Sequence, residues 1–145
     1  MVPDDETDRS LLSLLAQNAR LPVATLARRL GLARTTVQAR IERLEARGVI
    51  AGYTLKLGHS ARPPIRATVL ITLEPRSQPE VLARLKSLPG VEHVTTTSGR
   101  FDLIATLTAT GTDALDATLD RITQARGVKS SESLIHLSAK IDRTA

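Results

Sequence analysis

Residues 23–47 read VATLARRLGLARTTVQARIERLEAR and carry two apolar stripes at helical spacing, one on either side of Gly31. The first stripe begins near Pro22, a residue type favoured in a first helical turn, and it stops at Gly31. A glycine at that place can adopt the positive φ that ends a helix. The second stripe belongs to a helix predicted over about residues 34–47 and is formed by Val37, Ile41 and Leu44. We therefore predict two helices joined by the short turn at residues 31–33.

The second of these helices presents a polar, cationic face opposite its apolar stripe. This arrangement is typical of a helix-turn-helix motif, whose second helix lies in the major groove of DNA. The candidates for contacts with base edges are Thr35, Thr36, Gln38 and Ala39, and those for phosphate or guanine are Arg34, Arg40, Arg43 and Arg47. A small helical bundle with an ordinary solvated face has the same pattern and is the alternative.

An earlier helix is predicted to begin in an acidic segment. Asp5 and Asp8 have the three-residue spacing of a capping box, with Asp in place of the usual Glu, and acidic residues also suit the positive end of a helix dipole. Leucines then recur at helical spacing until the pattern fades at residues 17–19. The first part of the chain is therefore interpreted as three helices.

Composition and charge narrow the classes of function. The 145 residues are 41% apolar and 24% charged, which is typical of a folded globular protein. The absence of cysteine excludes disulfides, a thiolate nucleophile and cysteine metal sites. Tyr53 and Phe101 are too few aromatic residues for the stacking platforms that hold single-stranded nucleic acid. The net charge is +5, and the cations crowd into residues 20–56, where only Glu42 and Glu45 oppose them.

The same sequence offers little to support secretion, a membrane span or catalysis. The N-terminus is acidic and no apolar run approaches the ~20 residues of a membrane span, so we expect a cytoplasmic protein. His59, His93 and His136 are dispersed without metal-like spacing. Paired carboxylates at working spacing and a glycine-rich phosphate loop are also missing. We expect no metal, no cofactor and no catalytic residue.

The stretch from Asp8 to Leu57 resembles the DNA-binding domain of the Lrp/AsnC family, the leucine-responsive or feast/famine regulators. The resemblance rests on NAR at residues 18–20, LARRLGL at 26–32, TTVQARIERLEARGVI at 35–50 and GY at 52–53. It implies a regulator that binds double-stranded DNA through the helix beginning near Arg34. Ala33 departs from the serine that usually caps this helix in the family, and Pro22 from a small polar cap. We expect both departures to lower stability and to leave DNA binding intact.

The period of the apolar residues changes after the segment GHSARPPI at residues 58–65, whose paired prolines disfavour regular structure. From Ala67 apolar and polar residues alternate, which predicts a strand over about 67–73. Ser77 and Glu80 are expected to form a capping box for the next helix. Further strands are predicted over 91–98, 101–108 and 133–141, and helices over about 77–88 and 112–126. The order βαββαβ is that of the ferredoxin-like fold, with both helices on one face of an antiparallel sheet.

The predicted fold class is therefore α+β. It combines an N-terminal (winged) helix-turn-helix domain at residues 1–57, a linker at 58–66 and a C-terminal ferredoxin-like domain at 67–145 for ligand sensing and oligomerisation. The sheet face away from the helices carries Leu70, Ile104 and Leu134 among threonines, which is too apolar for open water over a whole sheet. We expect a homodimer that assembles into higher oligomers; a monomer with a half-polar sheet face is the alternative.

The second half also resembles the family, through LPGVEHV at residues 88–94, SGRFDLIATL at 98–107 and GVKSSESLIHL at 127–137. The resemblance implies an amino-acid effector site between dimers at Gly99, Arg100, Phe101 and Asp102. Asp102 would receive an ammonium group, and Arg100, which replaces a frequent acidic residue, would hold a carboxylate or form a surface ion pair. Alternatively, Asp102 only orders the loop.

Together these patterns predict a sequence-specific DNA-binding transcriptional regulator whose oligomeric state or DNA contacts respond to a small metabolite, an amino acid. Its partners would be double-stranded DNA, the effector and further copies of the chain. We expect no association with a membrane. The siroheme decarboxylases share this two-domain plan and are the enzymatic alternative, which the cationic helix and the lack of catalytic constellations disfavour. A DNA architectural protein with little sequence preference is a third interpretation.

Overall fold

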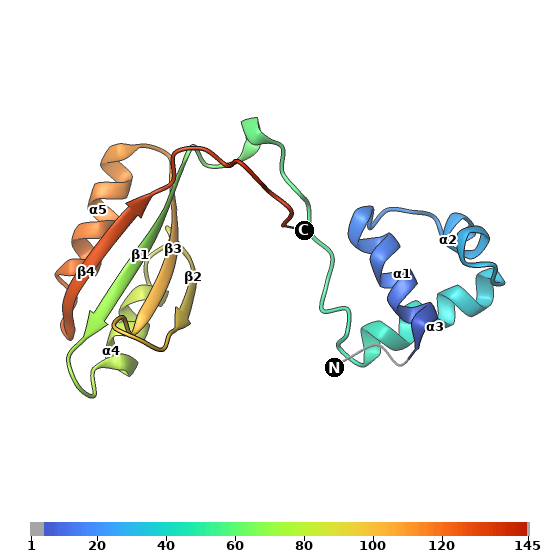
Figure 1. Ribbon diagram of the computed structural model, residues 1–145, viewed down its shortest axis with the longest axis horizontal. Coiled ribbons are helices and arrows are strands. Elements are labelled where there is room, and N and C mark those ends of the chain that lie inside the picture. Colours follow the sequence, from blue (N-terminus) through green and yellow to red (C-terminus); the bar gives the residue numbers. More distant parts are fainter. Residues whose placement is uncertain (1–4, 145) are drawn as a thin grey trace. The chain divides into compact units, whose positions relative to one another are not determined.

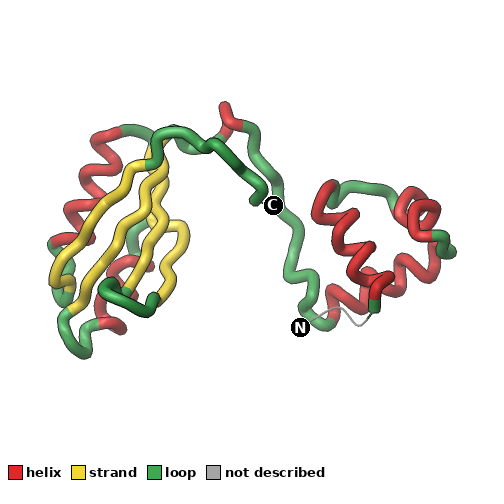
Figure 2. Tube along the Cα trace, viewed as in Figure 1, coloured by secondary structure: helices red, strands yellow, loops and turns green. Residues whose placement is uncertain are grey.

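The computed structural model describes residues 5–144 of the chain (Figure 1). These residues divide into two compact units, of which the first contains residues 5–57 and 143–144 and the second spans Gly58–Asp142. Helices make up the regular structure of the first unit, and a sheet with two long helices makes up most of the second (Figure 2).

Three helices form the first unit: α1 Glu6–Gln17, α2 Val23–Leu30 and α3 Arg34–Ala46. Their apolar stripes meet in one core, because the positions predicted from helical spacing all point inward. Gly31 has φ 67°, so the predicted glycine stop of α2 is confirmed. The buried side chains of this core are Leu11, Leu15, Leu26, Ala27, Val37, Ile41 and Leu44.

The helix starts of the first unit differ in how they are capped. The Asp5 carboxylate accepts a 2.8 Å hydrogen bond from the backbone N–H of Asp8, which confirms Asp5 as the N-cap of α1. Pro22 and Ala33 are the N-caps of α2 and α3, and neither makes a side-chain capping bond. Residues 48–58 form no strand, so the α+β class is confirmed without a β-hairpin wing after α3.

The second unit has the predicted order βαββαβ. It contains β1 Ile65–Leu73, α4 Gln78–Lys86, β2 Val91–Thr96, β3 Leu103–Ala109, α5 Thr112–Thr123 and β4 Val128–Ile135, preceded by the short 3₁₀ helix η1 His59–Ala61. The strands are antiparallel in the order β2-β3-β1-β4. Both helices cover the same face of the sheet, because their inward residues share one core with alternate residues of β1 and β3 (Figure 2).

Three details of the second unit correct the sequence-based expectations. The last strand was expected at residues 133–141 but runs over Val128–Ile135. At the edge of the sheet most of its side chains stay exposed, and residues 129–132 are all polar, so they give no alternating apolar signal. The third strand begins at Leu103 and not at Phe101. The capping box at Ser77 is also wrong, because its hydroxyl donates to the carbonyls of Glu74, at 2.6 Å, and Gly127, at 3.0 Å.

The sheet face away from the helices is partly apolar, as expected from the alternation. Leu70 of β1 lies opposite Ile104 of β3, and Thr68 lies opposite Leu134 of β4. Leu70 and Ile104 are half-buried, whereas Leu134 is 48% exposed. We call the surface around Leu70, Ile104 and Leu134 the open sheet face.

Candidate nucleic-acid interface

Helix α3 exposes one polar face because its apolar stripe is buried against α1 and α2. Val37, Ile41 and Leu44 are buried on one side of the helix, which leaves its polar side chains facing solvent. A shallow, open hollow on this helix is lined by Thr35, Thr36, Ala39, Arg40 and Arg43. We call the exposed side of α3, comprising Arg34, Thr35, Thr36, Gln38, Ala39, Arg43 and Arg47, the recognition face.

The recognition face can make the contacts that DNA bases require. The side-chain amide of Gln38 donates a 3.0 Å hydrogen bond to the Glu42 carboxylate one turn later. Both residues are exposed, and an exposed pair at this spacing contributes only a few tenths of a kcal/mol to a helix. Gln38 can therefore leave Glu42 and pair with an adenine at little cost.

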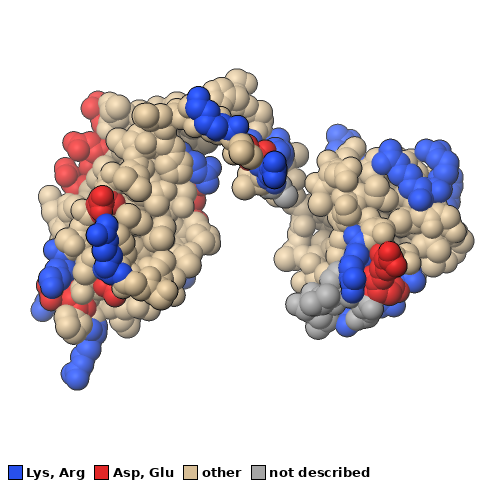
Figure 3. Space-filling model, viewed as in Figure 1, with Lys and Arg blue, Asp and Glu red and all other residues tan. Residues whose placement is uncertain are grey.

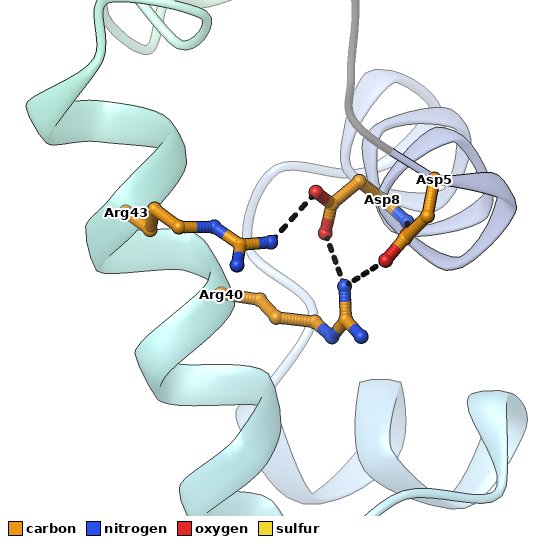
Figure 4. Close-up of polar contacts among 4 residues, drawn as sticks. All are labelled: Asp5, Asp8, Arg40 and Arg43. Carbon is orange, nitrogen blue, oxygen red and sulfur yellow. Dashed lines mark hydrogen bonds and ion pairs between the residues drawn. The ribbon is translucent and has the colours of Figure 1, made fainter.

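Two arginines of α3 are engaged by aspartates of the first unit (Figure 4). One guanidinium nitrogen of Arg40 lies 2.8 Å from the Asp5 carboxylate and 2.9 Å from that of Asp8. The Nη2 atom of Arg43 lies 2.9 Å from the other oxygen of Asp8. Asp8 is fully buried, and each of its two carboxylate oxygens is paired with an arginine. We call these four residues the ion cluster.

The ion cluster was not foreseen from the sequence, where Asp8 was interpreted only as part of a capping box. Spacing alone contained the signal: Asp8 stands three residues before Leu11 and seven before Leu15, on the same buried stripe. A carboxylate in such a position requires a cation or several hydrogen bonds. The arginines of α3 were the available partners.

Electrostatics in the ion cluster favour the charged forms. The hydrogen bond from Arg40, followed by that from the backbone of Asp8, holds the pKa of Asp5 below its ordinary value. Conversely, the hydrogen bonds to Asp5 and then Asp8 raise the pKa of Arg40. Arg40 is 22% exposed at its side chain, and within residues 5–144 its buried Nε atom has no hydrogen-bond partner.

Apart from Arg40, the arginines that were predicted to contact DNA are exposed at the surface. Arg34 and Arg47 are exposed at the two ends of α3, and the Arg43 side chain keeps 45% exposure despite its ion pair. On the side of the first unit that Figure 3 shows, Lys and Arg cover more surface than Asp and Glu. Seven of the eight predicted residues thus lie on α3 and Arg47 is its C-cap, with Arg40 turned toward the aspartates.

The four residues predicted for an effector lie in the loop between β2 and β3. Gly99 has φ +100°, which a glycine adopts without strain. The Arg100 guanidinium lies over the Phe101 ring, 4.9 Å from its centroid. One oxygen of Asp102 accepts a 2.8 Å hydrogen bond from the backbone N–H of Leu73 on β1. This hydrogen bond ties the Asp102 side chain to β1, and its exposed carboxylate retains acceptor capacity.

Among residues 5–144, no group of three or more His, Cys, Asp or Glu side chains is arranged to hold a metal ion. No helix within the same range combines the length and apolar character needed to cross a membrane.

Comparisons with known proteins extend over both units. Residues 5–45 match the AsnC-type helix-turn-helix domain, and residues 66–145 match the Lrp/AsnC ligand binding domain. The transcriptional regulator LysM of Sulfurisphaera tokodaii is 33% identical over 138 residues, covering 94% of this chain and 97% of that protein.

Solved structures agree with the fold. The structure of E. coli AsnC has a TM-score of 0.89 at 28% identity and covers 99% of both chains. A transcriptional regulator from Neisseria meningitidis, solved in complex with L-Met, has a TM-score of 0.89 at 22% identity, covering 97% of this chain and 94% of that one. At that identity the second likeness concerns the fold alone.

A three-helix unit with an exposed recognition helix, joined to a ferredoxin-like unit that matches a ligand-binding domain, defines a DNA-binding transcriptional regulator with a separate sensing domain. Both matched domain families are named after AsnC or Lrp/AsnC, and the relative LysM is named a transcriptional regulator. The chain belongs to the Lrp/AsnC family of transcriptional regulators.

Proposed function

We propose that this regulator recognises duplex DNA through the recognition face of α3. The observation that carries the proposal is the burial of Val37, Ile41 and Leu44, which leaves the polar side of the helix free to enter a major groove. Thr35, Thr36, Gln38 and Ala39 would read base edges by hydrogen bonds and contacts with thymine methyl groups. Arg34, Arg43 and Arg47 would bind phosphate or guanine, with Arg40 behind them in the ion cluster.

The DNA proposal is tested with the full chain and two duplexes. One is selected by the protein from a random library, and the other is a random sequence of equal length. A specific regulator binds the selected duplex roughly 10³-fold tighter or more, and its affinity for both falls as salt rises. Equal affinities would favour an architectural DNA protein instead.

We infer that the effector is an amino acid held by the loop of Gly99, Arg100, Phe101 and Asp102. The acceptor capacity of Asp102 suits an ammonium group, and Arg100 suits a carboxylate. The match of residues 66–145 to the Lrp/AsnC ligand binding domain supports a small-molecule effector, and a Neisseria meningitidis regulator with the same fold was solved with L-Met. The role inferred is binding without catalysis, in the cytoplasm where the DNA lies, because the relatives are transcriptional regulators.

The effector proposal is tested by thermal shift against the twenty amino acids. A ligand that binds only the folded state raises the melting temperature. The variant Asp102→Asn removes the charge but keeps an oxygen that can accept from the Leu73 N–H, so the loop should remain ordered. We expect an amino acid to raise the melting temperature of the native chain and not that of Asp102→Asn. A shift that survives the substitution would reject this site.

We also propose that the open sheet face pairs two copies of the chain, and that dimers assemble further. Leu70, Ile104 and Leu134 supply the apolar centre, and threonines surround them. A dimer would present two recognition helices to half-sites about one turn of DNA apart. An effector between dimers would then change DNA binding by favouring one assembly over another.

A further inference from the structure

We propose that Asp8 is a positioning residue for DNA recognition: it fixes the guanidinium of Arg43 at the edge of the recognition face and keeps Arg40 away from the DNA. This inference rests on the proposed function of α3 and adds a residue of α1, remote from the DNA-contacting helix in sequence. Its starting point is a fully buried carboxylate that bridges two arginines of the recognition helix (Figure 4).

The geometry divides the two arginines into different roles. Arg40 bonds to both Asp5 and Asp8 through one nitrogen, and its side chain is 22% exposed. Among residues 5–144, the Arg43 side chain bonds only to Asp8, through Nη2, and it is 45% exposed. A guanidinium has five N–H donors, so Arg43 keeps donors for a phosphate or a guanine while Asp8 holds one edge of it.

Burial makes this arrangement persistent. A carboxylate without solvent that loses its cation becomes an uncompensated buried charge, which is strongly unfavourable. Asp8 therefore has no low-energy alternative to binding Arg40 and Arg43. A long side chain such as arginine normally loses rotamer freedom when it binds DNA, and Asp8 makes part of that loss occur on folding instead.

Charge adds a second consequence. The two aspartates of the ion cluster balance its two guanidinium groups, so this side of α3 attracts phosphates less than its arginine count suggests. Asp8 thereby lowers the sequence-independent attraction to DNA while it orients Arg43. Its net effect is to favour the correct sequence over random DNA.

The variant Asp8→Asn tests this role, with Glu6→Gln as the matched control. Both substitutions neutralise one acid of α1, but Glu6 is exposed and lies outside the ion cluster. Affinities for the selected and the random duplex are measured over a salt series, at a temperature where circular dichroism shows each variant folded. The readout is the ratio of the two affinities, which partial unfolding alone does not move because it lowers both equally.

For Asp8→Asn we expect the ratio to fall at least about fivefold, the lower range for one misplaced specific contact, while affinity for random DNA is kept or rises. The salt slope should steepen by up to about one unit, since one more cation is free to bind phosphate. Glu6→Gln should keep the native ratio. A folded Asp8→Asn protein with the native ratio would overturn the proposal.

Asp8→Asn also leaves two guanidinium groups without their buried partner, and the chain could fail to fold. The double variant Asp8→Asn/Arg40→Gln removes one charge of each sign and leaves neutral amides in the cluster. Its net charge is native, yet Arg43 has lost its anchor, so the ratio should again fall at least about fivefold. A native ratio in this protein would overturn the role of Asp8. If the native chain itself binds no duplex, the proposed function fails, and this inference fails with it.

Discussion

The recognition face and the open sheet face are both surfaces that the fold leaves uncovered, but they differ in chemistry. The recognition face is built from hydroxyl, amide and guanidinium groups over a helix whose apolar side is buried. The open sheet face has leucine and isoleucine at its centre, in register across β1 and β3. A surface suited to DNA stays hydrated and cationic, whereas one suited to another protein keeps apolar side chains partly exposed. The contrast indicates two kinds of partner on one short chain.

The largest effect is expected from placing a charge in the open sheet face. Leu70 lies opposite Ile104 on one side and Glu132 on the other, so Leu70→Glu buries a carboxylate beside a like charge. We expect the proposed dimer to weaken by about 3–5 kcal/mol, which raises its dissociation constant by roughly 10²-fold to 10³-fold or more. Analytical ultracentrifugation measures this, with Ala114→Glu on the exposed side of α5 as a control. A Leu70→Glu protein that stays dimeric would remove this face from the interface.

A smaller effect is expected within the recognition face, where base contacts and phosphate contacts should separate. Gln38→Ala should lose about 1–3 kcal/mol of discrimination at one base pair. Arg34→Ala, at the exposed start of α3, should weaken selected and random duplexes more evenly and reduce the salt slope by about one unit. Binding to a panel of single-base variants, repeated over a salt series, distinguishes the two. The division of roles is wrong if both variants change the same base preference.

A stabilising effect is expected at the start of the recognition helix. Ala33 is the N-cap of α3 and makes no side-chain capping bond. Ala33→Ser supplies a hydroxyl that can accept from an N–H of the first turn, so the free energy of unfolding should rise by about 0.5–2 kcal/mol. Urea denaturation measures the change. An unchanged midpoint would mean that another group already satisfies those N–H donors.

The smallest effect is expected at the exposed edge of the ion cluster. The pKa of Asp5 is lowered from 3.8, chiefly by the hydrogen bond from Arg40. Its contribution to stability is therefore present above 3.8 and is lost as the pH falls through the lower pKa of the folded state. Asp5→Asn, which keeps a capping oxygen, should melt lower than the native chain near neutral pH and equally in strong acid. A difference in melting temperature that persists in strong acid would contradict this pKa shift.

Much of the fold could be predicted because its signals are local. The helical period of the leucines and the glycine at position 31 predicted α1 to α3, and alternation predicted β1. The edge strand β4 was predicted to begin at residue 133 and not at Val128, because residues 129–132 are polar and mostly exposed. Ser77 was misassigned because its hydroxyl donates to the nearby carbonyl of Glu74 and to that of Gly127, fifty residues away in sequence. Contacts of that range leave no periodic pattern in a sequence.

The functional residues show the same difference between local signals and long-range contacts. Exposure of Thr35, Thr36 and Gln38 follows directly from helical geometry and was predicted. The ion pairs of Arg40 and Arg43 join α1 to α3, and they depend on how the helices pack. Helical spacing nevertheless placed Asp8 on a buried stripe, so a search for charged residues at core positions would have found it.

The central claim is that the recognition face binds duplex DNA, and fluorescence anisotropy with a labelled duplex at low ionic strength tests it most directly. The native chain is compared with Thr36→Glu, which adds a negative charge to the middle of that face. We predict that the native chain binds with an affinity that falls steeply as salt increases, and that Thr36→Glu binds at least about tenfold more weakly. No binding by the native chain, or equal binding by the two proteins, would contradict the claim.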